Sequence, residues 1–304
     1  MDITLANKKQ AWLHAIRLRT LPLALSSILM GSFLAAYNQS FRWDVFLLAA
    51  LTTVFLQILS NLANDYGDSV HGADSQKRQG PIRAVQSGVI SLAEMKKAMI
   101  LLSSLSLTSG LVLLYIALQD WKLFALFLAL GILAIIAAIT YTSGKKPYGY
   151  AGLGDLSVFI FFGLLGVSGT YFLHALTFDW VILLPAVSLG LFSTAVLNIN
   201  NIRDIESDSM AGKKSIPVRI GKKAALIYNW ILILGGNISI IIFAFSGNQF
   251  WALAPILISP LMIKVGFGVS EGKDARAIDP FLKKMAISTL LWVIVFGSAW
   301  FIFN

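Results

Sequence analysis

Long apolar runs alternate with short polar stretches along most of this 304-residue chain. A run of about 20 apolar residues is the length that an α-helix needs to cross a bilayer. The alternating pattern of β-strands is absent, so a bundle of membrane-spanning helices is the expected fold. The nine predicted spans are 21–37, 44–62, 97–118, 122–142, 153–173, 180–198, 225–245, 250–268 and 285–303.

Composition supports an all-α membrane protein. Hydrophobic residues make up 57% of the chain and charged residues 13%, whereas a soluble domain is about one quarter charged. We expect a single integral membrane domain over residues 1–304, surrounded by the lipid bilayer. The chain contains no cysteine, which excludes disulfide and thiolate chemistry.

The basic residues predict the orientation of the chain. Of the 24 Lys and Arg residues, 22 fall in the N-terminal arm and in the loops on that same side, and only Arg42 and Lys122 fall on the other. Basic residues concentrate on the cytoplasmic side of membrane proteins. The N-terminus is therefore expected in the cytoplasm and Asn304 outside. No basic stripe or aromatic stacking platform accompanies the net charge of +9, so nucleic acid is not expected as a partner.

Two acidic clusters stand out, because the chain has only 15 acids. The first, residues 61–74, follows the second predicted span, and the second, residues 200–208, follows the sixth. Both contain the spacing Asn-x-x-x-Asp, as Asn61 and Asp65 in one and as Asn200 and Asp204 in the other. Each then continues with a further acid, Asp68 or Asp208. We interpret this pseudo-repeat as two halves of one site on the cytoplasmic side.

The spacing of these acids indicates a metal ion. On a helix, side chains three and four residues apart share a face, and like charges there repel each other. A divalent cation would relieve that repulsion, and oxygen ligands without a nearby thiolate or imidazole suit Mg²⁺. His71 is expected to be an ordinary loop residue. The predicted metal ligands are Asn61, Asp65, Asp68, Asp204 and Asp208.

Basic loops follow both clusters. Lys77, Arg78 and Arg83 follow the first, and Lys213, Lys214 and Arg219 follow the second. Acids followed by bases in both halves suit a doubly anionic ligand held through metal, such as a diphosphate. Two other features lie near the cytoplasmic ends of the middle spans, namely the pair Tyr141 and Lys145 and the isolated acid Asp155. The acids before the last span (Glu271, Asp274 and Asp279) are expected to be solvated.

This arrangement suits the ionisation of an allylic diphosphate. Metal and basic side chains neutralise charge on the leaving diphosphate. The allylic cation that remains is captured by a nucleophile in a site shielded from water. A polyprenyl chain could lie between the helices.

The chain resembles the UbiA superfamily of intramembrane aromatic prenyltransferases over essentially its whole length. The resemblance lies in the nine spans, the two acidic clusters and Tyr141-x-x-x-Lys145. The first family motif, Asn-x-x-x-Asp-x-x-x-Asp, is matched by Asn61 and Asp65 but has Ser69 at its third position, so either Asp68 or Asp74 completes it. The second, Asp-x-x-x-Asp, is matched by Asp204 and Asp208.

Within this superfamily, three segments are most similar to the 1,4-dihydroxy-2-naphthoate polyprenyltransferases of menaquinone synthesis. They are Asn64-Asp-Tyr-Gly-Asp68, Gly72-Ala-Asp74 and Arg78-Gln-Gly-Pro-Ile-Arg83. The resemblance implies Mg²⁺-dependent transfer of a polyprenyl group from polyprenyl diphosphate to 1,4-dihydroxy-2-naphthoate, with loss of the carboxylate. The product would be demethylmenaquinone, made in the bacterial cytoplasmic (inner) membrane.

The resemblance also assigns roles to residues. The five predicted metal ligands would hold Mg²⁺ and, through it, the diphosphate, and Tyr141 would face the allylic cation. Direct diphosphate contacts are implied for Lys145, Arg83, Lys213 and Arg219, and further substrate contacts for Asn64, Arg19 and Asp155, of which the last two lie on the acceptor side.

Other functions fit the same residues. The acceptor could be 4-hydroxybenzoate, homogentisate, a haem or a glycerol phosphate lipid. A cation-coupled transporter is the alternative from another class, although transporter carboxylates lie nearer the bilayer midplane. A non-catalytic lipid-binding scaffold would not need Asp65 or Asp204.

Overall fold

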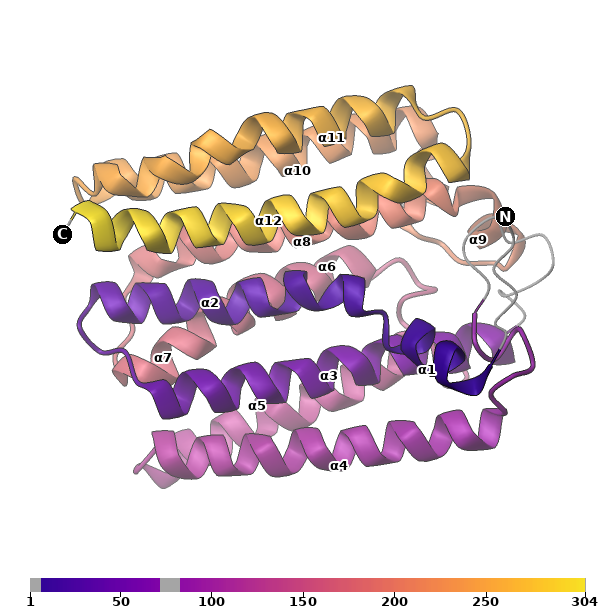
Figure 1. Cartoon of the computed structure of the whole chain (residues 1–304), viewed down its shortest axis with the longest axis horizontal. Helices are drawn as coiled ribbons and strands as arrows, with labels where there is room; N and C mark the ends of the chain where they lie inside the picture. The colour runs from indigo at the N-terminus through magenta and orange to yellow at the C-terminus, as the bar shows by residue number, and fades with distance from the viewer. Residues whose placement is uncertain (1–6, 72–82, 304) are drawn as a thin grey trace.

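The computed structural model describes residues 7–71 and 83–303, and these ranges form a helical bundle without strands (Figure 1). Nine of the helical segments in the described ranges are long and apolar enough to cross a membrane, as the sequence predicts. The elements are α1 (Lys8–Ile16), η1 (Leu18–Thr20), α2 (Leu21–Tyr37), α3 (Trp43–Val70), α4 (Leu92–Ala117), α5 (Trp121–Thr140), α6 (Gly154–Val158), η2 (Phe159–Ser168), α7 (Gly169–Ala175), η3 (Trp180–Ile182), α8 (Leu183–Arg203), α9 (Ile205–Met210), α10 (Ile216–Ser246), η4 (Phe250–Ile258), α11 (Ser259–Glu271) and α12 (Ala275–Phe303).

Most spans are longer than their apolar runs. Helix α3 ends at Val70 rather than at residue 62, so Asp65 and Asp68 lie on the helix and not in a loop after it. Their side chains are buried in the protein interior, which removes the need for an apolar sequence there. Asp74, with Lys77 and Arg78, lies outside the described residues.

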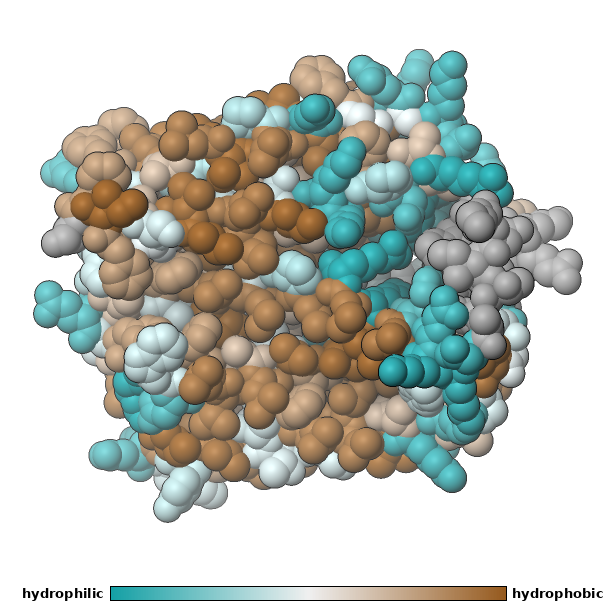
Figure 2. All heavy atoms as spheres, in the orientation of Figure 1, coloured by the Kyte–Doolittle hydropathy of each residue, from teal (hydrophilic) through white to brown (hydrophobic). Residues whose placement is uncertain are grey.

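The ends of the bundle differ in polarity. Helices α1 and α9 both lie toward one end of the bundle, and the C-terminal end of α12 lies at the other (Figure 1). The face shown in Figure 2 is mostly hydrophobic along its length, and hydrophilic residues gather at the α1 and α9 end. This distribution suits a bundle that crosses a membrane with one strongly polar end.

Two groups of helices enclose an internal space. In one group, α8 packs closely against α10, η2 and α12, and Phe192, Trp292 and Phe296 are completely buried there. In the other group, α3 packs against α4 and α5. None of the residues of α5 is buried, because this helix faces the surroundings on one side and the internal space on the other.

Candidate active site

A cavity of about 700 Å³ lies between the two groups of helices. Apolar residues of α5 and η2 line its deeper part, and charged residues line the end near α1 and α9. The predicted site residues that line the cavity are Arg19, Asn61, Asn64, Asp65, Asp68, Arg83, Tyr141, Asp155, Asp204, Asp208 and Lys213. The folded chain therefore brings residues that are far apart in sequence to one internal surface.

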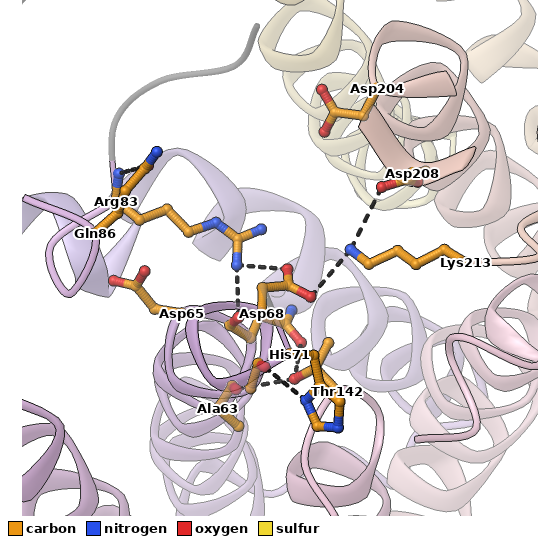
Figure 3. Close-up of polar contacts among 12 residues, drawn as sticks. Ala63, Asp65, Asp68, His71, Arg83, Gln86, Thr142, Asp204, Asp208 and Lys213 are labelled. Atoms are coloured by element: carbon orange, nitrogen blue, oxygen red, sulfur yellow. Dashed lines mark hydrogen bonds and ion pairs between the residues drawn. The ribbon is translucent and has the colours of Figure 1, made fainter. Parts of the chain in front are cut away.

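Asp68 is the centre of the first acidic cluster (Figure 3). Its Oδ2 lies 2.5 Å from Arg83 Nη1, and its Oδ1 lies 3.0 Å from Lys213 Nζ. The Tyr150 hydroxyl donates a 2.8 Å hydrogen bond to the same Oδ1. One turn earlier on α3, Asp65 accepts a 3.2 Å hydrogen bond from the backbone N–H of Ala84. A buried carboxylate of this kind is stable only because cations and donors surround it.

Lys213 joins the two halves of the predicted site. Its Nζ lies 3.4 Å from Asp208 Oδ1 as well as 3.0 Å from Asp68 Oδ1, and it sits 4.9 Å from the centre of the Tyr150 ring. In Figure 3 the side chain of Lys213 ends between Asp68 and Asp208, with a dashed line to each acid. Burial raises the pKa of Asp208, and the positive charge of Lys213 opposes that rise. Lys213 therefore pairs with one acid of each cluster.

Asp204 belongs to a chain of ion pairs that crosses three elements. Arg203 donates to both of its carboxylate oxygens, at 2.8 and 2.6 Å, and also to Asp279 Oδ1 at 2.5 Å. Asp279 Oδ2 lies 3.6 Å from Arg19 Nη1. The expectation that Asp279 is a solvated loop acid is therefore wrong. It lies on α12, whose helix begins ten residues before the predicted span, and it pairs with the almost fully buried Arg203.

The two asparagines of the first cluster are held by hydrogen bonds to the protein. Asn61 donates to the carbonyl of Ile16 at 2.8 Å and to Thr20 Oγ1 at 3.0 Å. Asn64 Oδ1 accepts a 3.2 Å hydrogen bond from Thr142 Oγ1. These contacts fix α3 against the N-terminal segment and against the turn after α5.

Tyr141 lies where α5 ends, and it lines the cavity. Its hydroxyl borders Gly154, since a Cβ atom built on that glycine would lie 2.7 Å from the oxygen. Burial, with Asp155 as the next cause, raises the pKa of Tyr141. The side chain is therefore a neutral phenol at physiological pH, and it faces the same space as the acids.

Two predicted diphosphate contacts lie elsewhere. Lys145 is exposed in the turn after α5 and does not line the cavity. Arg219 is exposed and donates to the carbonyls of Lys214 at 2.8 Å and Ala151 at 2.5 Å. Arg219 thereby holds the loop before α10 against the turn before α6. His71 caps α3, with its ring nitrogens 2.8 and 3.0 Å from the carbonyl oxygens of Gly67 and Gly144.

Sequence reasoning missed three residues of the site. Tyr150 and Arg203 contact the acids directly, and Thr142 donates to the carbonyl of Ala63 at 2.9 Å beside the first cluster. Arg203 lies inside the second cluster, next to Asp204, so its position in the sequence could have identified it as a site residue. Tyr150 and Thr142 carry no such signal, because only the folding of the turn after α5 over α3 brings them close.

The donor set fits a hard cation such as Mg²⁺. Carboxylate oxygens of Asp68 and Asp208 converge on one positive group from opposite sides, and Asp65 and Asp204 line the same end of the cavity. In the described part of the chain, no three acid, His or Cys side chains are already gathered tightly enough to hold an ion. When a metal ion binds, these acids would therefore contact both the ion and the basic side chains that neutralise them in this structure.

The model of the UbiA prenyltransferase family matches residues 24–301. The chain is 45% identical to the 1,4-dihydroxy-2-naphthoate octaprenyltransferase of Escherichia coli, covering 97% of each chain. It is 34% identical to the enzyme of the same name from Mycobacterium tuberculosis, covering 95% of this chain and 96% of the relative.

Solved structures share the fold. A UbiA homologue from Archaeoglobus fulgidus bound to DMAPP and Mg²⁺ superposes with a TM-score of 0.65 at 17% identity, covering 95% of this chain and 98% of that one. The apo structure of a UbiA homologue from Aeropyrum pernix has a TM-score of 0.67 at 18% identity, covering 94% and 98%. The chain therefore belongs to the UbiA prenyltransferase family of integral, multi-pass membrane enzymes.

Proposed function

We propose that this protein transfers a polyprenyl group from a polyprenyl diphosphate to 1,4-dihydroxy-2-naphthoate, with loss of the carboxylate, to give demethylmenaquinone. The observation that carries the proposal is the 45% identity, over 97% of both chains, to a relative named for that reaction. The site supports it independently, because acids and bases meet at the polar end of an apolar cavity.

The charged end of the cavity would bind the diphosphate. Asp65, Asp68, Asp204 and Asp208, with Asn61 beside them, are the residues that would hold Mg²⁺. The bound metal would neutralise negative charge on the diphosphate oxygens as the bond to the allylic carbon breaks.

Arg83 and Lys213 are the side chains that would neutralise diphosphate charge together with the metal. Both are largely buried and already lie within 3.0 Å of Asp68, so they are preorganised where the leaving group gains charge. If either side chain moved from a carboxylate oxygen to a diphosphate oxygen, its positive charge would stay paired with a negative group.

The deeper cavity would hold the polyprenyl chain and shield the allylic cation from water. Its walls there are side chains such as Phe127, Leu128, Phe161 and Phe162. Tyr141 lies between this apolar part and the acids, where its ring can face the cation. The acidic end would lie toward the cytoplasm, with the N-terminus inside and the C-terminus outside, as the basic loops predict.

A competition experiment with purified protein tests the acceptor. The protein receives Mg²⁺, octaprenyl diphosphate and equimolar 1,4-dihydroxy-2-naphthoate, 4-hydroxybenzoate and homogentisate, and mass spectrometry identifies the products. We expect decarboxylated, prenylated naphthoquinol as the main product. Prenylated benzoate or homogentisate as the main product would contradict the proposed acceptor, and ion flux in proteoliposomes without any product would favour a transporter.

A further inference from the structure

Asp155 is an acid of the cavity that belongs to neither metal cluster. It lies in the first turn of α6, it is 7% exposed, and it lines the cavity. Its Oδ2 atom is buried and has no hydrogen-bond partner among the described residues. The Tyr228 hydroxyl of α10 faces the same carboxyl group. The buried Oδ2 of this carboxyl group therefore lacks a donor in the part of the chain that the structure describes.

Each of the four other acids that line the cavity has a basic side chain or a backbone N–H as a partner. Asp68 and Asp208 share Lys213, Asp204 pairs with Arg203, and Asp65 accepts a backbone N–H. Asp155 has no ion pair with the part of the chain that the structure describes. A buried carboxylate oxygen without a donor costs free energy, so a ligand that donates a hydrogen bond would be favoured there.

The depth of Asp155 indicates which part of a substrate it meets. Thr194 Oγ1 of α8 lies 3.5 Å from its backbone carbonyl. Thr194 precedes Asp204 by ten residues on α8, which at 1.5 Å per residue corresponds to about 15 Å of helix. Asp155 thus lies below the charged end. The preceding Gly154 borders the Tyr141 hydroxyl, and the apolar Phe161 and Phe162 line the same cavity. An aromatic ring that attacks the allylic carbon would occupy this level.

We propose that Asp155 is a recognition site for a ring hydroxyl of the aromatic acceptor, with Oδ2 accepting the hydrogen bond. This inference rests on the proposed function, and it also predicts the orientation of the acceptor. The negative charge of Asp155 repels the acceptor's carboxylate, which therefore points toward the arginines at the polar end, while a hydroxyl points toward α6. Tyr228 is a positioning residue for Asp155.

Equilibrium binding with hydroxyl-deleted acceptors tests the proposal. Binding of 1,4-dihydroxy-2-naphthoate, 1-hydroxy-2-naphthoate and 4-hydroxy-2-naphthoate is measured in the wild type, Asp155→Leu and Asp155→Asn. A hydrogen bond to a charged group predicts that loss of the recognised hydroxyl weakens wild-type binding roughly 10- to 100-fold. Asp155→Leu should bind the full acceptor and that analogue equally, and Asp155→Asn should retain a smaller preference.

Ser193→Ala is the matched control, because Ser193 Oγ is another buried cavity atom without a hydrogen-bond partner among the described residues. Its hydroxyl preference should equal that of the wild type. If Asp155→Leu fails to fold, Asp155→Asn and Tyr228→Phe still test the idea, since both should reduce the preference. The proposal would be overturned if every Asp155 and Tyr228 variant kept the wild-type preference for the full acceptor over both hydroxyl-deleted analogues.

A second probe pair separates this inference from the proposed function. Naphthalene-1,4-diol and 1-naphthol differ by one hydroxyl and carry no carboxylate. If the wild type fails to use dihydroxynaphthoate but binds the diol more tightly through Asp155, the acceptor assignment fails and the hydroxyl site stands. If dihydroxynaphthoate is converted while neither pair shows Asp155-dependent discrimination, the function stands and the hydroxyl site is refuted.

Discussion

Replacing Lys213 with Met removes a side chain that pairs with an acid of each cluster. Lys213 Nζ lies 3.0 Å from Asp68 and 3.4 Å from Asp208, and its side chain is only 16% exposed. The substitution keeps an unbranched apolar stem of similar length but leaves two buried carboxylates facing each other. We expect the metal-free protein to lose stability and to regain it when Mg²⁺ is added.

The distances set the size of this effect. At an effective dielectric constant of about 20, unit charges 3.0 Å apart attract by about 5.5 kcal/mol before desolvation is counted. Breaking a buried ion pair by removing one partner costs about 3–5 kcal/mol. Because Arg83 and Tyr150 still serve Asp68, we expect the lower end, about 3 kcal/mol. For a chain of this size that lowers the unfolding midpoint by roughly 6–12 °C.

The assay is thermal unfolding of purified protein in one detergent, with EDTA and across a Mg²⁺ titration. Lys214→Met is the control, because the neighbouring side chain is exposed. A ligand that binds only the folded state raises its stability with concentration. We therefore expect a larger Mg²⁺-induced rise for Lys213→Met than for the wild type or the control.

Either of two results would refute this reasoning. An unchanged midpoint in EDTA would mean that Lys213 does not neutralise the two carboxylates. Equal Mg²⁺-induced shifts in all three proteins would mean that the metal does not bind where Lys213 now bridges the clusters.

Three further substitutions test the remaining contacts. Asp279→Asn should lower stability by about 1.5–3 kcal/mol in thermal unfolding, because the buried Arg203 loses one of its two carboxylate partners and keeps Asp204. Gly67→Ala should cost about 1–3 kcal/mol through overpacking, since its Cβ would overlap the carbonyl oxygen of Thr142, and wild-type stability would contradict that packing. The exposed position of Lys145 predicts that Lys145→Met changes kcat/KM by no more than about twofold, whereas a 100-fold loss would restore the diphosphate contact that the family resemblance implies.

The sequence predicted the fold through its simplest signal. Apolar runs of bilayer length gave nine spans, and the observed α2 begins and ends at the predicted residues. The ends of α3 and α12 were missed, because their last or first turns carry buried polar residues that hydropathy assigns to loops. Such turns are stabilised by partners on other helices, and these partners are not visible in a local sequence window.

The site was predictable where a pattern repeats. The shared spacing around Asp65 and Asp204 identified both acidic segments, and the cavity brings them together. The partners of the acids were harder to find. Asp279 looked solvated because its contact with Arg203 joins residues 76 positions apart, and Tyr150 reaches Asp68 only through the fold of an irregular turn.

The central claim is that the two acidic clusters form one metal and diphosphate site. The most direct test is Mg²⁺-dependent binding of a prenyl diphosphate to the wild type, Asp65→Asn, Asp204→Asn and the double variant. One shared site predicts that each single variant loses the Mg²⁺-dependent part of the affinity and that the double variant loses nothing more, because residues acting as a unit are not additive. Partial losses that add up in the double variant would show two independent sites and would contradict the account.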